Sequence, residues 1–167
     1  MMRWLKELFG RSVEVYEERG DVVVRVVRKE RLLEVLRVLR DHTQSQYKCI
    51  TDITCVDYPN REKRFEVVYI LLSVRYSRRL RLKVEVEELE SIESTTGLYK
   101  GSDWLEREVY DMFGIVFEGH GDLRRLLTDY GFEGHPLRKD FPLTGYREVR
   151  YDEGKKSVVS EEVESVY

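Results

Sequence analysis

Apolar and polar residues recur along the first hundred residues with the two periods that distinguish strands from helices. From Leu80 to Val86 apolar residues alternate strictly with charged ones, which predicts a strand exposed on one face. The run from Phe65 to Val74 is apolar at both odd and even positions, as in a central strand covered on both faces. Residues 30–41 place leucines and valines on one helical face, which predicts an amphipathic helix. Weaker patterns predict a helix over residues 4–9, hairpin strands at 13–17 and 21–27, a strand over 46–56 and a helix over 88–98.

The order of these elements, α-β-β-α-β-β-β-α, indicates an α+β fold. We expect a two-layer sandwich with helices on one face of a mixed β-sheet, in an α/β domain that spans residues 1–100. A short helix follows within residues 101–116. Trp104 to Phe113 form its body, Ser102 or Asp103 its N-cap and Gly114 its C-cap.

Residues 117–167 are expected to form a long, extended, partner-binding C-terminal arm. From about 115 to 151 neither a strand period nor a helix period is sustained, because glycines and prolines interrupt both. The same stretch is rich in aromatic and apolar side chains, which a disordered tail would lack. An irregular segment this long is also unusual inside a compact domain. We therefore expect the arm to insert these side chains into another protein; the alternative is an arm that folds back over its own sheet.

Composition adds a heavily charged surface with little net charge. Charged residues make up 37% of the 167 and hydrophobic residues 41%, with a net charge of −3. A protein that bound nucleic acid by bulk charge would be clearly basic, so we expect no nucleic-acid partner. Residues 1–100 carry 20 basic and 17 acidic side chains, and residues 101–167 carry 9 and 15, so the first part is net +3 and the second net −6. The net charge therefore changes sign at about residue 100, where the predicted α/β domain also ends.

Neither a membrane span nor a targeting signal is visible in the sequence. The longest apolar run, Val67 to Leu72, is far shorter than the ~20 residues that cross a bilayer. The first residues lack the long apolar region of a signal peptide and carry an acid early. We expect the protein to stay in the compartment where it is made.

The two cysteines do not predict a disulfide or a metal site. Cys49 and Cys55 lie six apart in a predicted strand, so their Cα atoms would be ~20 Å apart. We expect both to be small buried hydrophobes. The sequence contains no glycine-rich dinucleotide motif, no phosphate-binding loop and no C-x-x-C pair, so we expect no cofactor.

The arm contains a short internal repeat. Phe117-Glu118-Gly119-His120 returns as Phe132-Glu133-Gly134-His135, and each copy is followed by a leucine, an arginine and a second basic residue. Two similar turns would then present an aromatic ring, a carboxylate and a guanidinium, a group suited to fixing orientation at an interface. His120, His135 and a nearby carboxylate could also form a two-His-carboxylate metal site. The more ordinary interpretation is that both histidines bond to the backbone of turns.

Charged residues on the short helix and in the domain have simple interpretations. Arg107 and Asp111 are four apart and can pair along the helix, whereas Glu106 and Glu108 point to different faces and make no acid/base pair. Asp52 and Asp57 have no nucleophile, histidine or glycine loop near them in sequence. The basic run Arg75 to Arg81 is expected to be a solvated turn or a patch that meets an acidic partner, with an RNA-binding module as an alternative.

The run Trp104 to Ile115 resembles the signature of the 30-kDa subunit of respiratory complex I (the bacterial C subunit, or mitochondrially encoded subunit 9). The resemblance continues through 119–143 to about 152, and upstream Asp57-Tyr58-Pro59 and Phe65 to Tyr69 are similar to the family's central hairpin. It covers about residues 45–160. Gly121 stands where the family usually has proline, which loosens one turn.

This resemblance implies a core structural subunit of the hydrophilic arm of NADH:ubiquinone oxidoreductase, without a cofactor or an active site of its own. Such a subunit packs beside the 49-kDa-type subunit and the iron–sulfur subunits, and scaffolds them for electron transfer from NADH to ubiquinone. It implies membrane association only through the complex, at the matrix side of the mitochondrial inner membrane or the cytoplasmic face of a bacterial inner membrane. The alternatives are an equivalent subunit of a related membrane-bound hydrogenase or respiratory-type dehydrogenase, and a metal-dependent enzyme that uses His120 and His135.

We expect the partner interface to be formed by charged and aromatic residues of the short helix and the arm. These residues are Glu106, Arg107, Glu108, Asp111, Phe117, His120, Arg124, Arg125, Asp129, Tyr130, Phe132, His135, Arg138, Lys139 and Phe141.

Overall fold

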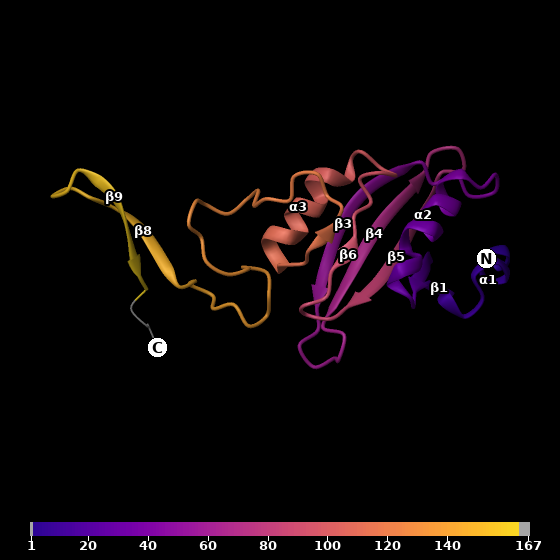
Figure 1. The fold of residues 1–167 in the computed structure, drawn as a ribbon, viewed down its shortest axis with the longest axis horizontal. Helices are drawn as coiled ribbons and strands as arrows, with labels where there is room; N and C mark the ends of the chain where they lie inside the picture. Colours follow the sequence, from indigo (N-terminus) through magenta and orange to yellow (C-terminus); the bar gives the residue numbers. More distant parts are fainter. Residues whose placement is uncertain (1, 164–167) are drawn as a thin grey trace.

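A five-stranded mixed sheet forms the centre of the computed structural model, which describes residues 2–163 (Figure 1). The strand order is β1-β2-β5-β4-β3, with β2 and β5 parallel and every other pair of neighbours antiparallel. The strands are β1 (Val13–Glu18), β2 (Asp21–Val26), β3 (Cys49–Asp57), β4 (Phe65–Ser73) and β5 (Arg78–Val86). All five correspond to predicted strands.

The two faces of the sheet differ in chemistry, as the alternation in β5 predicts. On one face Phe65 pairs with Val86 and Leu71 with Leu80, and these side chains belong to a single buried core. The other face carries charged residues that pair with one another: Lys83 Nζ lies 3.3 Å from Glu66 Oε1, and Arg25 Nη2 lies 2.6 Å from Glu85 Oε1. Burial of apolar area therefore places the helices on the first face only.

Within residues 2–163, three α-helices complete the second layer: α1 (Arg3–Phe9), α2 (Leu32–Asp41) and α3 (Ser102–Phe113). Two short 3-10 helices, Gly10–Ser12 and Lys29–Arg31, precede β1 and α2. The face of α2 with Leu32, Val35, Leu36 and Leu39 is buried, and buried side chains of all three helices join the same core. α3 packs against β3 and ends at Gly114, which adopts the left-handed conformation expected of a C-cap. The predicted two-layer sandwich with helices on one face of a mixed sheet is confirmed.

The predicted helix over residues 88–98 is wrong. This stretch contains a short strand, β6 (Ile92–Glu93), which pairs in parallel with β7 (Phe117–Glu118). The hydroxyls of Ser94 and Thr95 and the Thr95 backbone N–H donate to the carboxylate of Glu106 on α3. Serine and threonine that find such partners compete with helix formation, and here the partner lies outside the local sequence.

After β7 the chain forms two different parts, which we call the arm segment (residues 119–146) and the terminal hairpin. The arm segment contains neither helix nor strand. The terminal hairpin consists of β8 (Arg147–Asp152) and β9 (Ser157–Glu162) and extends away from the sheet, at the opposite end of the molecule from α1 (Figure 1). The expected extended arm therefore includes regular strands that its sequence pattern does not reveal. Its last four residues, 164–167, lie outside the described part of the chain.

The cysteines differ from one another. Cys55 is buried in the core as expected, and burial raises the pKa of its thiol to about 12. Cys49 is exposed, so the prediction of two buried cysteines is wrong for Cys49, whose side chain lies on the charged face of the sheet opposite Leu72. Across residues 2–163, helices are too short or too polar to cross a bilayer.

Candidate subunit interface

The arm segment is anchored to α3 through the carboxylate of Asp111, a side chain with no exposed surface. Asp111 Oδ2 accepts the backbone N–H groups of Leu126, Leu127 and Thr128 at 3.1, 2.8 and 2.9 Å. Its Oδ1 accepts the Thr128 hydroxyl at 2.7 Å and Arg125 Nη1 at 3.3 Å. Burial acts to raise the pKa of Asp111, but these donors outweigh it and the net shift is downward.

Arg107, one turn earlier on α3, binds carbonyl groups just before the N–H groups that Asp111 binds. Its Nε donates to the Arg124 carbonyl at 3.2 Å and its Nη2 to the Arg125 carbonyl at 3.3 Å. The expected pair between Arg107 and Asp111 is therefore wrong, because each residue has nonlocal partners in the arm segment. Helix and arm segment are joined by charge-assisted hydrogen bonds, which are stronger than neutral ones.

Both histidines of the repeat bond to the backbone of α3. His120 Nε2 lies 3.1 Å from the Asp103 carbonyl oxygen and 3.0 Å from its Oδ1. His135 Nδ1 lies 2.9 Å from the Asp111 carbonyl oxygen, and burial lowers the pKa of its ring. In the described part of the chain, no cluster of three or more His, Cys, Asp or Glu side chains could hold a metal ion. The geometry favours the ordinary interpretation of these histidines over the metal site.

A second anchor holds residues 138–140 of the arm segment against α3 and the sheet domain. Arg138 Nε donates to the Phe113 carbonyl at 2.6 Å, and its Nη1 lies 2.9 Å from Glu88 Oε1. The Lys139 backbone N–H donates to Asp57 Oδ2 at 2.8 Å, although the two residues are 82 apart in sequence. Arg64 Nε lies 2.8 Å from Asp57 Oδ1 and its Nη2 3.0 Å from Asp140.

Sequence reasoning missed the three residues of the domain that form this second anchor, Asp57, Arg64 and Glu88. The hydrogen bond from Arg64 is the main cause that holds the pKa of Asp57 below its usual value. The spacing of Asp57 and Arg64 across the β3–β4 connection was the available signal, because ends of paired strands bring such residues together. No feature of the sequence near Asp57 indicated that the Lys139 backbone N–H would also bind its carboxylate.

The arm segment exposes large apolar side chains although its backbone is fixed. The exposed fractions are 61% for Leu127, 104% for Tyr130, 52% for Leu137, 103% for Leu143 and 53% for Tyr146. Single exposed apolar residues are ordinary, but a concentration of them on one anchored segment is typical of a protein–protein contact surface. Within the same segment the Phe141 ring stacks on Phe132 at 5.9 Å and meets the Tyr146 ring edge-on at 5.2 Å.

The terminal hairpin continues this surface. Val149, Tyr151 and Val158 lie on one face of the hairpin and are all exposed. The other face carries a bidentate pair between Arg150 and Glu161, at 2.8 and 2.9 Å. An isolated two-stranded hairpin is marginally stable in water, so an apolar face of this kind gains stability when a partner covers it.

The structure divides the predicted interface residues by their burial. Glu106, Arg107, Asp111 and Phe117 are buried within the chain. Arg107 and Asp111 hold the arm segment, whereas Glu106 holds Ser94 and Thr95. The His120 side chain is also buried, with 1% of its surface exposed. The remaining residues are exposed or partly exposed: Glu108, Arg124, Arg125, Asp129, Tyr130, Phe132, His135, Arg138, Lys139 and Phe141. Their contact with a partner stays a prediction.

Comparison with known proteins identifies the family of this chain. Residues 25–147 match the sequence model of the family described as respiratory-chain NADH dehydrogenase, 30 Kd subunit. The chain is 52% identical over 159 residues to a subunit of the NADH-quinone oxidoreductase of Mesorhizobium japonicum, covering 95% of this chain and 79% of the relative. It is 47% identical over 161 residues to the mitochondrial NADH-ubiquinone oxidoreductase 30.4 kDa subunit of Neurospora crassa, covering 96% of this chain and 57% of the relative.

A solved structure shows the same fold. A trypsin-resistant fragment of Nqo5 superposes with a TM-score of 0.62 at 32% identity, over 72% of this chain and 97% of the fragment. The chain belongs to the family of the 30-kDa subunit of respiratory-chain NADH dehydrogenase.

Proposed function

We propose that this chain is a core structural subunit of the hydrophilic arm of NADH:ubiquinone oxidoreductase. The observation that carries the proposal is an arm segment whose backbone is fixed to α3 and the sheet while its large apolar side chains face outward. A pre-organised surface binds with less loss of conformational freedom than a free tail. Membership of the 30-kDa family supplies the assembly in which such a surface would be used.

In this proposal the chain carries no redox centre, and its role is to set the distance between its neighbouring subunits. It holds the 49-kDa-type subunit and the neighbouring iron–sulfur subunits at the separation that electron transfer from NADH to ubiquinone requires. Its association with the membrane is peripheral and runs through the complex. The relatives are compatible with the matrix side of the mitochondrial inner membrane or the cytoplasmic face of a bacterial one, and their names favour complex I over the related hydrogenase assembly.

The test uses two leucines that are equally exposed. Leu143 in the arm segment is 103% exposed and Leu89, in the turn after β5, is 100% exposed. Leu143→Asp and Leu89→Asp are each expressed in a host that lacks its own copy of the subunit. We expect Leu143→Asp to reduce co-purification with the 49-kDa-type subunit by at least about tenfold, because a charge in an apolar contact is costly to desolvate.

Leu89→Asp should assemble like the unsubstituted chain. Circular dichroism of the two purified chains checks that neither substitution unfolds the protein. Equal assembly of both variants would refute the arm segment as the contact surface, and a stable chain that co-purifies with no partner would refute the scaffold role itself.

A further inference from the structure

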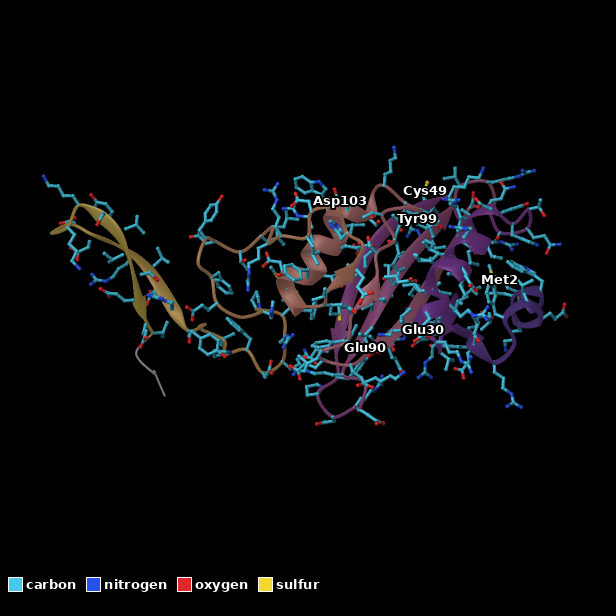
Figure 2. The ribbon with its side chains drawn as sticks, viewed as in Figure 1. Met2, Glu30, Cys49, Glu90, Tyr99 and Asp103 are labelled. Carbon is cyan, nitrogen blue, oxygen red and sulfur yellow. The ribbon has the colours of Figure 1, made fainter. Side chains whose placement is uncertain are left out.

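A cleft lies at the end of the molecule opposite to the terminal hairpin. Its volume is about 530 Å³, and four segments form it: α1, the β1–β2 turn, the loop after α2 and the β4–β5 turn. Figure 2 shows Met2, one of the lining residues, at this end of the long axis, far from Asp103 at the start of α3. The cleft therefore shares no residue with the arm segment or its anchors.

Aromatic residues form its walls and are held in place. The Trp4 ring stacks on His42 with ring centres 4.0 Å apart. The Tyr76 hydroxyl donates to the Thr43 carbonyl at 2.6 Å, which ties the β4–β5 turn to the loop after α2. Tyr47 is almost completely buried and completes the apolar side. The cleft is thus formed in the chain as it stands, within the usual size range of ligand sites.

The polar side of the cleft is basic. Arg78 and Arg79 both line it and are exposed. Among the described residues, no hydrogen bond or ion pair engages either guanidinium, whereas the charged face of the sheet pairs Arg25 with Glu85 and Arg81 with Asp21. Asp21, the acid that lines the cleft, is the one paired with Arg81 at 3.1 Å. Two guanidiniums therefore remain available to an anion from outside.

A second hollow of about 520 Å³ adjoins the first and shares Asp21 and Arg79 with it. Leu72 and Val74 line this hollow, and Val74 is 68% exposed. Arg79 thus stands between an aromatic and an aliphatic depression. This combination suits an extended segment whose carboxylates meet the arginines while its apolar side chains enter the depressions.

We propose that this cleft is a second docking surface, which binds an acidic polypeptide segment of another protein through Arg78 and Arg79. Arginine pairs with carboxylates in a bidentate geometry, and the aromatic walls accept apolar residues on either side of them. A nucleic acid would need a longer basic track along its backbone, whereas this cleft is lined by two arginines and by the carboxylate of Asp21. The inference does not depend on the arm segment or on the proposed scaffold role.

The test uses the two tryptophans of the chain, because Trp4 lines the cleft and Trp104 lies on α3. The full-length chain with ¹⁵N-labelled tryptophan is titrated with the blocked hexapeptide Glu-Glu-Leu-Glu-Glu-Phe, with its Gln-Gln-Leu-Gln-Gln-Phe counterpart and with an RNA hexamer. We expect the glutamate peptide to shift the indole signal of Trp4 and leave that of Trp104 unchanged. Arg78→Gln with Arg79→Gln should weaken the apparent affinity at least about tenfold.

The matched control is Arg28→Gln with Arg37→Gln, two exposed arginines outside the cleft, which should bind like the unsubstituted chain. An unmoved Trp104 signal in the Arg78/Arg79 variant shows that the fold is intact. The proposal is overturned if the glutamate peptide leaves Trp4 unshifted, if the glutamine peptide binds equally well, if the Arg78/Arg79 variant binds normally, or if RNA shifts Trp4 more strongly than the peptide.

Discussion

At the residue scale, the carboxylate of Asp111 joins α3 to the arm segment. It accepts hydrogen bonds from three consecutive backbone N–H groups, a hydroxyl and a guanidinium. A carboxylate that accepts several backbone N–H bonds is favoured in its charged form, which agrees with the lowered pKa. The local backbone of residues 126–128 therefore depends on one side chain from a different element.

We predict that Asp111→Asn destabilises the chain by about 3 kcal/mol, because the amide leaves buried donors without an acceptor. Urea unfolding of the full chain measures the change. Glu108→Gln removes an exposed carboxylate from the same helix and should alter stability by less than about 0.5 kcal/mol. Equal effects of the two substitutions would show that Asp111 is not an anchor.

His135 should make the stability depend on pH in the weakly acidic range. Burial lowers its pKa in the folded chain, so below its unfolded pKa of about 6.5 the unfolded chain binds a proton that the folded chain resists. The free energy of unfolding therefore falls as the pH is lowered from 7 to about 5.5. In His135→Gln this part of the fall should disappear, as measured by urea unfolding at both pH values. Parallel pH dependence in the two chains would contradict the assignment.

At the element scale, the C-terminus of α3 determines how closely the arm segment can pack against the helix. Gly114 has φ of +79°, and a Cβ on it would lie 2.6 Å from His135 Nε2 and 2.7 Å from Arg138 Nη2. Both side chains are themselves held, by the Asp111 and Phe113 carbonyls. The helix can therefore end in this conformation, with the arm packed across it, only if the C-cap residue has no side chain.

We predict that Gly114→Ala destabilises the chain by at least about 1 kcal/mol more than Gly119→Ala. Gly119 has φ of +78°, so its alanine carries the same backbone strain, but nothing lies within 4 Å of the added Cβ. Thermal and urea unfolding of both variants compare the two costs. Equal destabilisation would mean that the close approach of His135 and Arg138 contributes nothing.

The helices and strands also show which elements the hydrophobic pattern of the sequence can predict. The alternation in β5 and the one-sided face of α2 are local, and both predict the observed elements. The stretch 88–98 is predicted to be a helix, yet Glu106 of α3 accepts hydrogen bonds from Ser94 and Thr95 and holds them in a nonhelical conformation before a turn at residues 96–98. A periodic pattern in the sequence cannot reveal a side chain of another element that binds these residues after folding and so competes with helix formation.

At the scale of the whole molecule, the sheet domain separates two candidate docking regions. The arm segment and the terminal hairpin extend from one end (Figure 1). The basic cleft is lined by residues of the other end, among them Met2 and Trp4. A protein with separate surfaces at its two ends can fix the distance between two neighbours. A single core links α1, α2 and α3 to the sheet, which would supply the rigidity that the proposed scaffold role needs.

Limited proteolysis should reveal the order in which these parts open. We predict that trypsin first cuts the full chain in the terminal hairpin, at Lys155 or Lys156, because two exposed strands without further packing open readily. Arg124 and Arg125 should be cut later, since their carbonyls accept hydrogen bonds from Arg107. Intact-mass measurement of the fragments over time gives the order. A first cut at Arg124 or Arg125 would show that the arm segment is not anchored without a partner.

The sequence alone determined the strands and helices with strong local periods, the face that each buries, the C-cap glycine and the family signature. These depend on neighbours within a few residues. Only the tertiary structure decided that Asp111 binds residues 126–128, that Asp57 binds the Lys139 backbone, and which residues of the arm face outward. The physical reason is that a charged side chain binds the best hydrogen-bond partners within reach after folding. Arg107 donates to backbone carbonyls and Asp111 accepts backbone N–H groups, all brought from far along the chain, and the i, i+4 spacing of the two residues could not compete with them.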